Sequence, residues 1–167
     1  QSSYLYVLEQ SEGSRCTQLS RYDSSTLDKK TIELLPYGGS RTSVWALNCY
    51  ASVDGMAVSA DSVLCIGTTI DQSQYDNVTS DTPHNIYLTI TPVSDFSKEA
   101  TSVKYLTNYT GNGKSFMGVK ITPITENRFM ISWEEYENTD DSSSENYAAA
   151  DDSLSSSTLH YLFVDGK

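Results

Sequence analysis

Several features that would assign this chain to a familiar class of protein are missing from its sequence. No apolar run approaches the roughly 20 residues that a membrane-spanning helix needs, so no membrane span is expected. There are only three cysteines, Cys16, Cys49 and Cys65, and no C-x-x-C pair, which argues against a structural zinc site. Cys49 and Cys65 could form a disulfide if their strands are neighbours, although buried free thiols are the commoner state.

Basic residues are scarce as well. The 167 residues include 11 lysines and arginines against 22 acids, which gives a formal net charge of -11. Such a chain is repelled by the phosphates of nucleic acids and by anionic membrane surfaces, so neither is an expected partner. The simplest explanation of the acidity is solubility.

Motifs for catalysis and metal binding are also lacking. Neither His84 nor His160 accompanies a G-x-S-x-G motif, so a nucleophilic triad is not expected. The acids of the polar segment 137–158 lack the glycine and the terminal glutamate of an EF-hand loop, and we predict a solvated loop there. The sequence therefore predicts no catalytic residue, no cofactor and no metal.

What the sequence does contain is a dense set of strand signals with almost no helix signal. Hydrophobic residues make up 38% of the chain, which is enough for one domain with a substantial core. Short runs of alternating β-branched and aromatic residues are bounded by Gly, Asn, Asp and Ser, the pattern of strands and turns. The predicted strands are Tyr4–Glu9, Thr17–Tyr22, Thr31–Leu35, Gly55–Ser59, Val63–Thr69, Asn85–Thr91, Ser102–Thr107, Phe116–Ile121, Arg128–Trp133 and Leu159–Val164.

These strands recur as a repeated unit. Three times a strand, a polar segment and a second strand follow one another, and each second strand meets an aspartate: Asp23, Asp95 or Asp165. A short strand that begins after glycine precedes the last two hairpins, and a further strand follows the first two. The complete unit is four antiparallel strands, which is the blade of a β-propeller.

Three segments, "YASVDGMAVSADSVLCIGTTIDQ", "NIYLTITPVSDF" and "NRFMISWEE…LHYLFVDGK", resemble the blades of secreted β-propeller repeat proteins of gut-type Gram-positive bacteria. The resemblance spans nearly the whole chain. It concerns architecture, because the family has no catalytic signature to transfer to a numbered residue here. It implies display outside the cell or at the cell surface and a role in recognition or scaffolding.

The expected fold is all-β, with about three propeller blades of four antiparallel strands and no significant helix. We assign residues 1–43 to an incomplete first blade, 44–110 to the second and 111–167 to an incomplete third. Three incomplete blades cannot close a ring and leave strand edges open. We therefore expect a second polypeptide, a second copy or a further fragment to complete the propeller. The start at Gln1, without Met or signal-peptide features, favours a processed or cropped N-terminus.

Aromatic residues in predicted loops are candidate ligand contacts, because tyrosine supplies rigid contact area with a polar tip. The tyrosines that fall in predicted loops are Tyr37, Tyr50, Tyr75, Tyr109, Tyr136 and Tyr147. Trp45 lies in the crossover between the first two blades, on the face where propellers usually bind ligands. We select Trp45, Tyr50, Tyr75 and Tyr109 as candidate contacts for a carbohydrate or protein ligand. Half-burial on β surfaces explains the tyrosines equally well, and Trp133 is expected to be buried.

The function that the sequence favours is a non-enzymatic extracellular recognition or scaffold module. Two alternatives stay open. One is a polysaccharide-active hydrolase or lyase with its site at the propeller axis, for which Glu134, Glu135 and Asp54 are the carboxylates near strand ends. The other is a structural subunit that joins an assembly through open strand edges.

Overall fold

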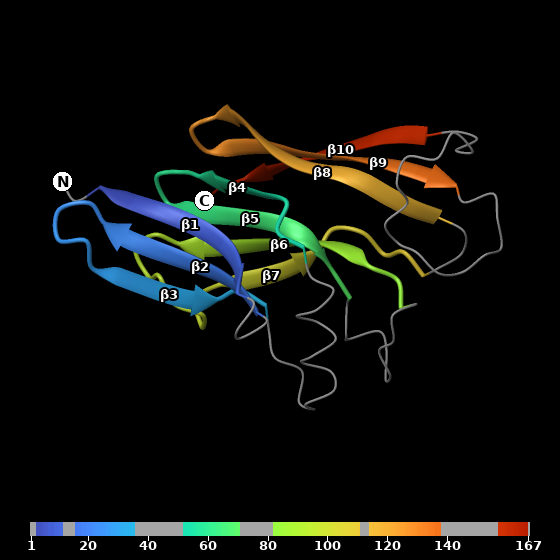
Figure 1. The fold of residues 1–167 in the computed structure, drawn as a ribbon. Helices are drawn as coiled ribbons and strands as arrows, with labels where there is room; N and C mark the ends of the chain where they lie inside the picture. Colours follow the sequence, from blue (N-terminus) through green and yellow to red (C-terminus); the bar gives the residue numbers. More distant parts are fainter. Residues whose placement is uncertain are drawn as a thin grey trace.

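The computed structural model describes residues 3–11, 16–35, 52–70, 82–110, 114–137 and 157–166. These residues form three antiparallel sheets and no helix, and each sheet is built from one continuous stretch of the chain (Figure 1). None of the described residues belongs to a helix that could cross a membrane. The all-β class predicted from the sequence is therefore confirmed.

The N-terminal sheet has the strand order β1-β2-β3, with β1 at Tyr4–Ser11, β2 at Cys16–Asp23 and β3 at Lys29–Glu33. The central sheet has the order β4-β5-β6-β7, with strands at Gly55–Val58, Ser62–Thr69, Asn85–Pro92 and Ser102–Tyr105. The C-terminal sheet has the order β10-β9-β8, with β8 at Lys114–Thr125, β9 at Arg128–Glu137 and β10 at Ser157–Asp165.

All ten predicted strands are present, and the differences lie at their ends. Strand β3 begins and ends two residues earlier than predicted. Strand β8 is the longest at 12 residues and continues through Pro123. It tolerates proline because it lies at the edge of its sheet, where one side of the strand pairs with no strand in the described part of the chain and needs no backbone N–H. Gly118, with φ at 66°, lies in a shift of register between Met117 and Lys120. The expectation that Tyr136 lies in a loop is wrong, because it belongs to β9 and is 3% exposed.

The central sheet is covered on both faces, as the layers in Figure 1 show. The core between it and the C-terminal sheet contains Leu64, Ile66, Leu88, Phe129 and Ile131. The core between it and the N-terminal sheet contains Leu19, Ile32, Val63, Cys65 and Phe96. This double covering explains why β5 is an almost continuous apolar run, with every residue from Ser62 to Gly67 buried.

Cys65 is a free thiol in the middle of this covered strand. Cys49, with which the sequence allows Cys65 to form a disulfide, lies outside the described residues. Burial raises the pKa of Cys65 to about 12 from an ordinary value of 9.0, because the thiolate has no water around it.

We expect the Cys65 thiol to make the stability of the fold depend on pH under alkaline conditions. Because the pKa of the thiol is raised in the folded state, its contribution to the free energy of unfolding is complete below pH 9.0. That contribution is lost as the pH rises toward about 12. Urea unfolding near pH 7 and near pH 10.5 measures the effect. Between these two pH values, the free energy of unfolding of the wild type should fall by about 2 kcal/mol more than that of Cys65→Val. Equal losses in the two proteins would show that Cys65 ionises freely in the folded state.

Candidate functional site

Of the four candidate contact residues, Trp45, Tyr50 and Tyr75 lie outside the described residues. Tyr109 is described, and it lies on the segment that leaves β7 and crosses to the C-terminal sheet. The surroundings of Tyr109 therefore define the candidate site that the structure can describe.

Asn85, the first residue of β6 and 0% exposed, holds this crossover in place. Its side-chain oxygen accepts hydrogen bonds from the Tyr109 N–H, at 2.7 Å, and from the Thr107 hydroxyl, at 2.9 Å. Its side-chain nitrogen donates to the Tyr109 carbonyl at 3.2 Å. One buried amide thus satisfies both backbone groups of Tyr109, and the direction of the Tyr109 side chain follows from that anchorage.

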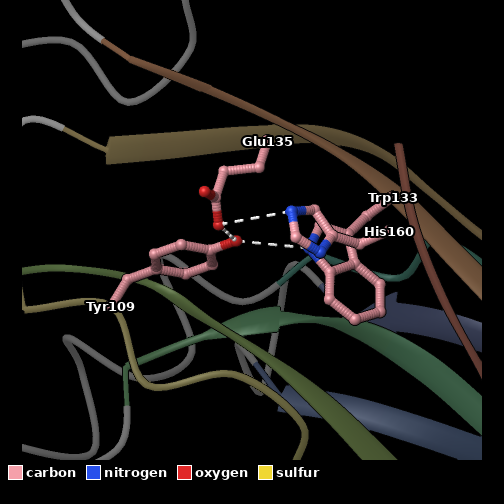
Figure 2. A network of polar contacts seen from close by, with 4 residues as sticks. All are labelled: Tyr109, Trp133, Glu135 and His160. Carbon is pink, nitrogen blue, oxygen red and sulfur yellow. Dashed lines mark hydrogen bonds and ion pairs between the residues drawn. The ribbon is translucent and has the colours of Figure 1, made fainter. Parts of the chain in front are cut away.

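The side chain of Tyr109 reaches the face of the C-terminal sheet that points toward the central sheet. There its hydroxyl donates to Glu135 Oε2 at 2.7 Å and accepts from Trp133 Nε1 at 3.2 Å (Figure 2). Its ring stacks on Phe116 with a centroid distance of 5.0 Å. The polar tip and one ring face of Tyr109 are therefore engaged within the chain, in a contact that joins the crossover to β8 and β9.

His160 of β10 completes the cluster. It lies opposite Trp133 in the antiparallel register, and the two rings stack 5.4 Å apart and 12° from parallel. His160 Nε2 lies 3.7 Å from Glu135 Oε2 and makes no hydrogen bond. The prediction that Trp133 is buried is confirmed, since it is 8% exposed.

The Tyr109 hydroxyl keeps its own proton at neutral pH. Burial raises the pKa of the Tyr109 hydroxyl, and the hydrogen bond to Glu135 raises that pKa further, because an adjacent carboxylate disfavours a phenolate. The hydroxyl therefore acts as a donor to Glu135 and as an acceptor from Trp133. The arrangement orients side chains and provides no activated nucleophile.

Two of the carboxylates considered for a glycosidase site, Glu134 and Glu135, do not face one another. Glu134 and Glu135 are neighbours in β9, and consecutive residues of a strand point to opposite faces of the sheet. Asp54 lies before the central sheet, where it accepts a hydrogen bond from the Ser52 hydroxyl. Within the described ranges, no three His, Cys, Asp or Glu side chains gather in a way that could hold a metal ion.

A second feature is the outward face of β10, which the prediction of ligand contacts missed. Leu159, Tyr161 and Phe163 alternate along this strand and are 72%, 63% and 48% exposed. Tyr161 and Phe163 contact each other edge to face at 5.8 Å, and the Arg128 guanidinium lies over the Phe163 ring at 4.9 Å. The three side chains form one apolar row, which we call the β10 face.

The sequence carried a signal for this face. In "LHYLFV" the apolar residues do not alternate with charged ones, and both faces of the strand carry large side chains. Strands of this kind are usually covered on both faces. In the structure Leu162 and Val164 pack against the core between the C-terminal and central sheets and His160 stacks on Trp133, whereas the β10 face is exposed.

A hollow of about 410 Å³ lies between β3 and the turn at 97–99. The Lys98–Glu33 ion pair, 3.6 Å between Nζ and Oε2, joins its two sides. The other charged residues along it are Lys30 and Glu99, so charges of both signs are balanced. The hollow favours no particular ligand.

Comparison with known proteins yields no match to any family model, to any curated protein or to any solved structure. The function must therefore be argued from the residues themselves.

Proposed function

We propose that this chain is a non-enzymatic extracellular recognition or scaffold module. Its three sheets are the blades of a β-propeller segment, and the β10 face is the surface on which a second polypeptide packs. The observation that carries the proposal is the exposed row Leu159, Tyr161 and Phe163.

The β10 face has the composition of a protein contact. Aromatic residues and arginine are enriched at the centres of protein interfaces, and Tyr161, Phe163 and Arg128 lie together here. A contiguous apolar row on a sheet edge is also a liability in a free molecule, because unpaired strands attract other chains. Among the described residues, strand β10 pairs with β9 on one side and with no strand on the other.

The loop aromatics remain part of the proposal as contacts for a carbohydrate or protein ligand. They are Trp45, Tyr50, Tyr75 and Tyr109. For Tyr109, the hydrogen bonds to Glu135 and Trp133 would hold the ring in one orientation, which lowers the entropy lost on binding. The opposed directions of Glu134 and Glu135 weigh against the polysaccharide-active enzyme.

The proposal is tested by the native mass of the protein isolated from the cells or medium that produce it. Light scattering with denaturing mass spectrometry should give a complex heavier than the 18.5 kDa of one chain. Tyr161→Asp places a charge at the centre of the β10 face and should release the single chain. Leu27→Asp is the matched control, because Leu27 is 75% exposed in the turn after β2. A wild-type mass of 18.5 kDa, or a complex indifferent to Tyr161→Asp, would contradict the proposal.

A further inference from the structure

We infer that the polypeptide on the β10 face is a second copy of this chain, which presents the outward face of its N-terminal sheet. The inference rests on the proposed function and names the partner. It follows from a comparison of equivalent positions in the three sheets.

The three sheets share a register that backbone hydrogen bonds define. One hairpin of two consecutive strands in each sheet carries this register: β1 and β2, β5 and β6, and β9 and β10. In each hairpin, the N–H of the residue that follows the second strand donates to the carbonyl of the residue that precedes the first strand. These bonds are Ser24 to Ser3 at 3.0 Å, Val93 to Asp61 at 2.8 Å, and Gly166 to Asn127 at 2.9 Å. Leu19, Leu88 and Tyr161 are equivalent, because each lies the same number of residues before the donor of this bond. Their partners across the hairpin, Leu8, Ile66 and Ser132, lie the same number of residues after the acceptor.

These equivalent residues face the next sheet along the chain. Leu19 is 0% exposed against the central sheet, and Leu88 is 1% exposed against the C-terminal sheet. Tyr161 holds the same position and is 63% exposed. Two residues earlier in each strand, and on the same face, Thr17 and Ile86 are 1% and 0% exposed, and their equivalent Leu159 is 72% exposed. The β10 face is thus one half of an interface that the chain forms twice inside itself.

The other half of the same interface is uncovered at the opposite end of the molecule. Leu5, Val63 and Phe129 are equivalent, because they pair with Tyr22, Thr91 and Val164. Val63 and Phe129 face the preceding sheet and are 0% and 1% exposed, whereas Leu5 is 62% exposed. One chain therefore carries both complementary halves, and a second copy can supply to each the surface that it lacks.

The outward face of the N-terminal sheet is compatible with burial of its centre. Near Leu5, the Lys29 ammonium lies 3.8 Å from Glu9 Oε1 and 5.5 Å from the Tyr22 ring centroid, so this charge is matched within the face. Contact between unlike faces is heterologous and closes into a ring when the rotation allows. Two copies of the three-sheet chain would bring six sheets together, within the range of roughly four to eight blades in propellers.

Purified chain alone tests the inference, by sedimentation velocity and light scattering over a range of concentrations. The variants are Leu5→Asp and Tyr161→Asp, alone and mixed, with Leu27→Asp as control. Wild type and control should form species of at least twice 18.5 kDa. Each variant alone should sediment as one chain, because every contact between unlike faces needs both residues. An equimolar mixture should recover a species of two chains, since one intact face of each kind remains.

The outcomes separate this inference from the proposed function. All substituted side chains are exposed, and circular dichroism should show the wild-type β-sheet spectrum in each variant. If Tyr161→Asp dissociates the assembly and Leu5→Asp does not, like faces meet and the inference is overturned. If the purified chain stays at 18.5 kDa but the natively isolated complex holds a different polypeptide, the inference fails and the proposed function stands. Single chains in both preparations would overturn both.

Discussion

Replacement of Gly67 by alanine is expected to destabilise the fold by about 3 kcal/mol or more. A Cβ on Gly67 would lie 2.0 Å from the Ser52 carbonyl oxygen and 2.7 Å from the Tyr87 hydroxyl. Neither neighbour can move freely. Ser52 N–H donates to the Thr68 carbonyl at 2.8 Å, and the Ser52 carbonyl accepts from the Tyr87 hydroxyl, also at 2.8 Å. The methyl group therefore displaces the backbone at Ser52 and breaks both bonds.

Urea unfolding compared with Gly118→Ala separates this clash from the general effect of losing a glycine. Gly118 has φ at 66° and no atom within 4 Å of the position of an added Cβ. Alanine there costs only the strain of the left-handed conformation, roughly 1–2 kcal/mol. Gly67→Ala should be clearly the more destabilised of the two. Equal urea midpoints for the two variants would show that the backbone at Ser52 does not clash with a side chain at position 67.

Replacement of Asn85 by alanine should destabilise the protein by about 3 kcal/mol. The substitution removes the amide that bonds the Tyr109 N–H, the Tyr109 carbonyl and the Thr107 hydroxyl. Asn85 is 0% exposed, so water does not readily replace those bonds. The crossover between the central and C-terminal sheets loses its anchor, and the Tyr109–Glu135 hydrogen bond should weaken with it.

Denaturant unfolding of Asn85→Ala and Thr107→Ser measures this anchorage. Thr107→Ser keeps the hydroxyl that donates to Asn85 and accepts from the Ile86 N–H, and should cost no more than about 1 kcal/mol. Tyrosine and tryptophan fluorescence should change in Asn85→Ala, because Tyr109 contacts Trp133. A loss no greater than that of Thr107→Ser would show that Asn85 does not hold the crossover.

Strand positions could be predicted because their signal is local. Runs such as "NIYLTIT" carry β-branched and aromatic residues at period two, and the ends of β6 differ from the prediction by a single residue. The ends of β8 and β9 were missed for a different reason. Pro123 and the acidic residues Glu134 and Glu135 look like stop signals, but each strand continues because its partner across the sheet continues.

The Tyr109 cluster could be predicted only in part. Tyr109 was identified from its type and its place in a loop, whereas its hydrogen bonds to Trp133 and Glu135 join positions 24 and 26 residues apart. Those contacts depend on the antiparallel register, which places His160 opposite Trp133. They also depend on the crossover that Asn85 anchors. Neither is encoded in the spacing of the residues.

By itself the sequence determined the all-β class, the order of the strands and the burial of Trp133, because these follow from periodicity and side-chain size. The nearly continuous run of large side chains in β10 also gave large, mostly apolar side chains to both of its faces. Which of those faces is covered was decided by the tertiary structure alone. Leu162 and Val164 pack against the core that the C-terminal sheet shares with the central sheet, whereas Leu159, Tyr161 and Phe163 are exposed. The physical reason is that the hydrophobicity of a face belongs to its own strand, whereas its burial depends on which other sheet packs against it.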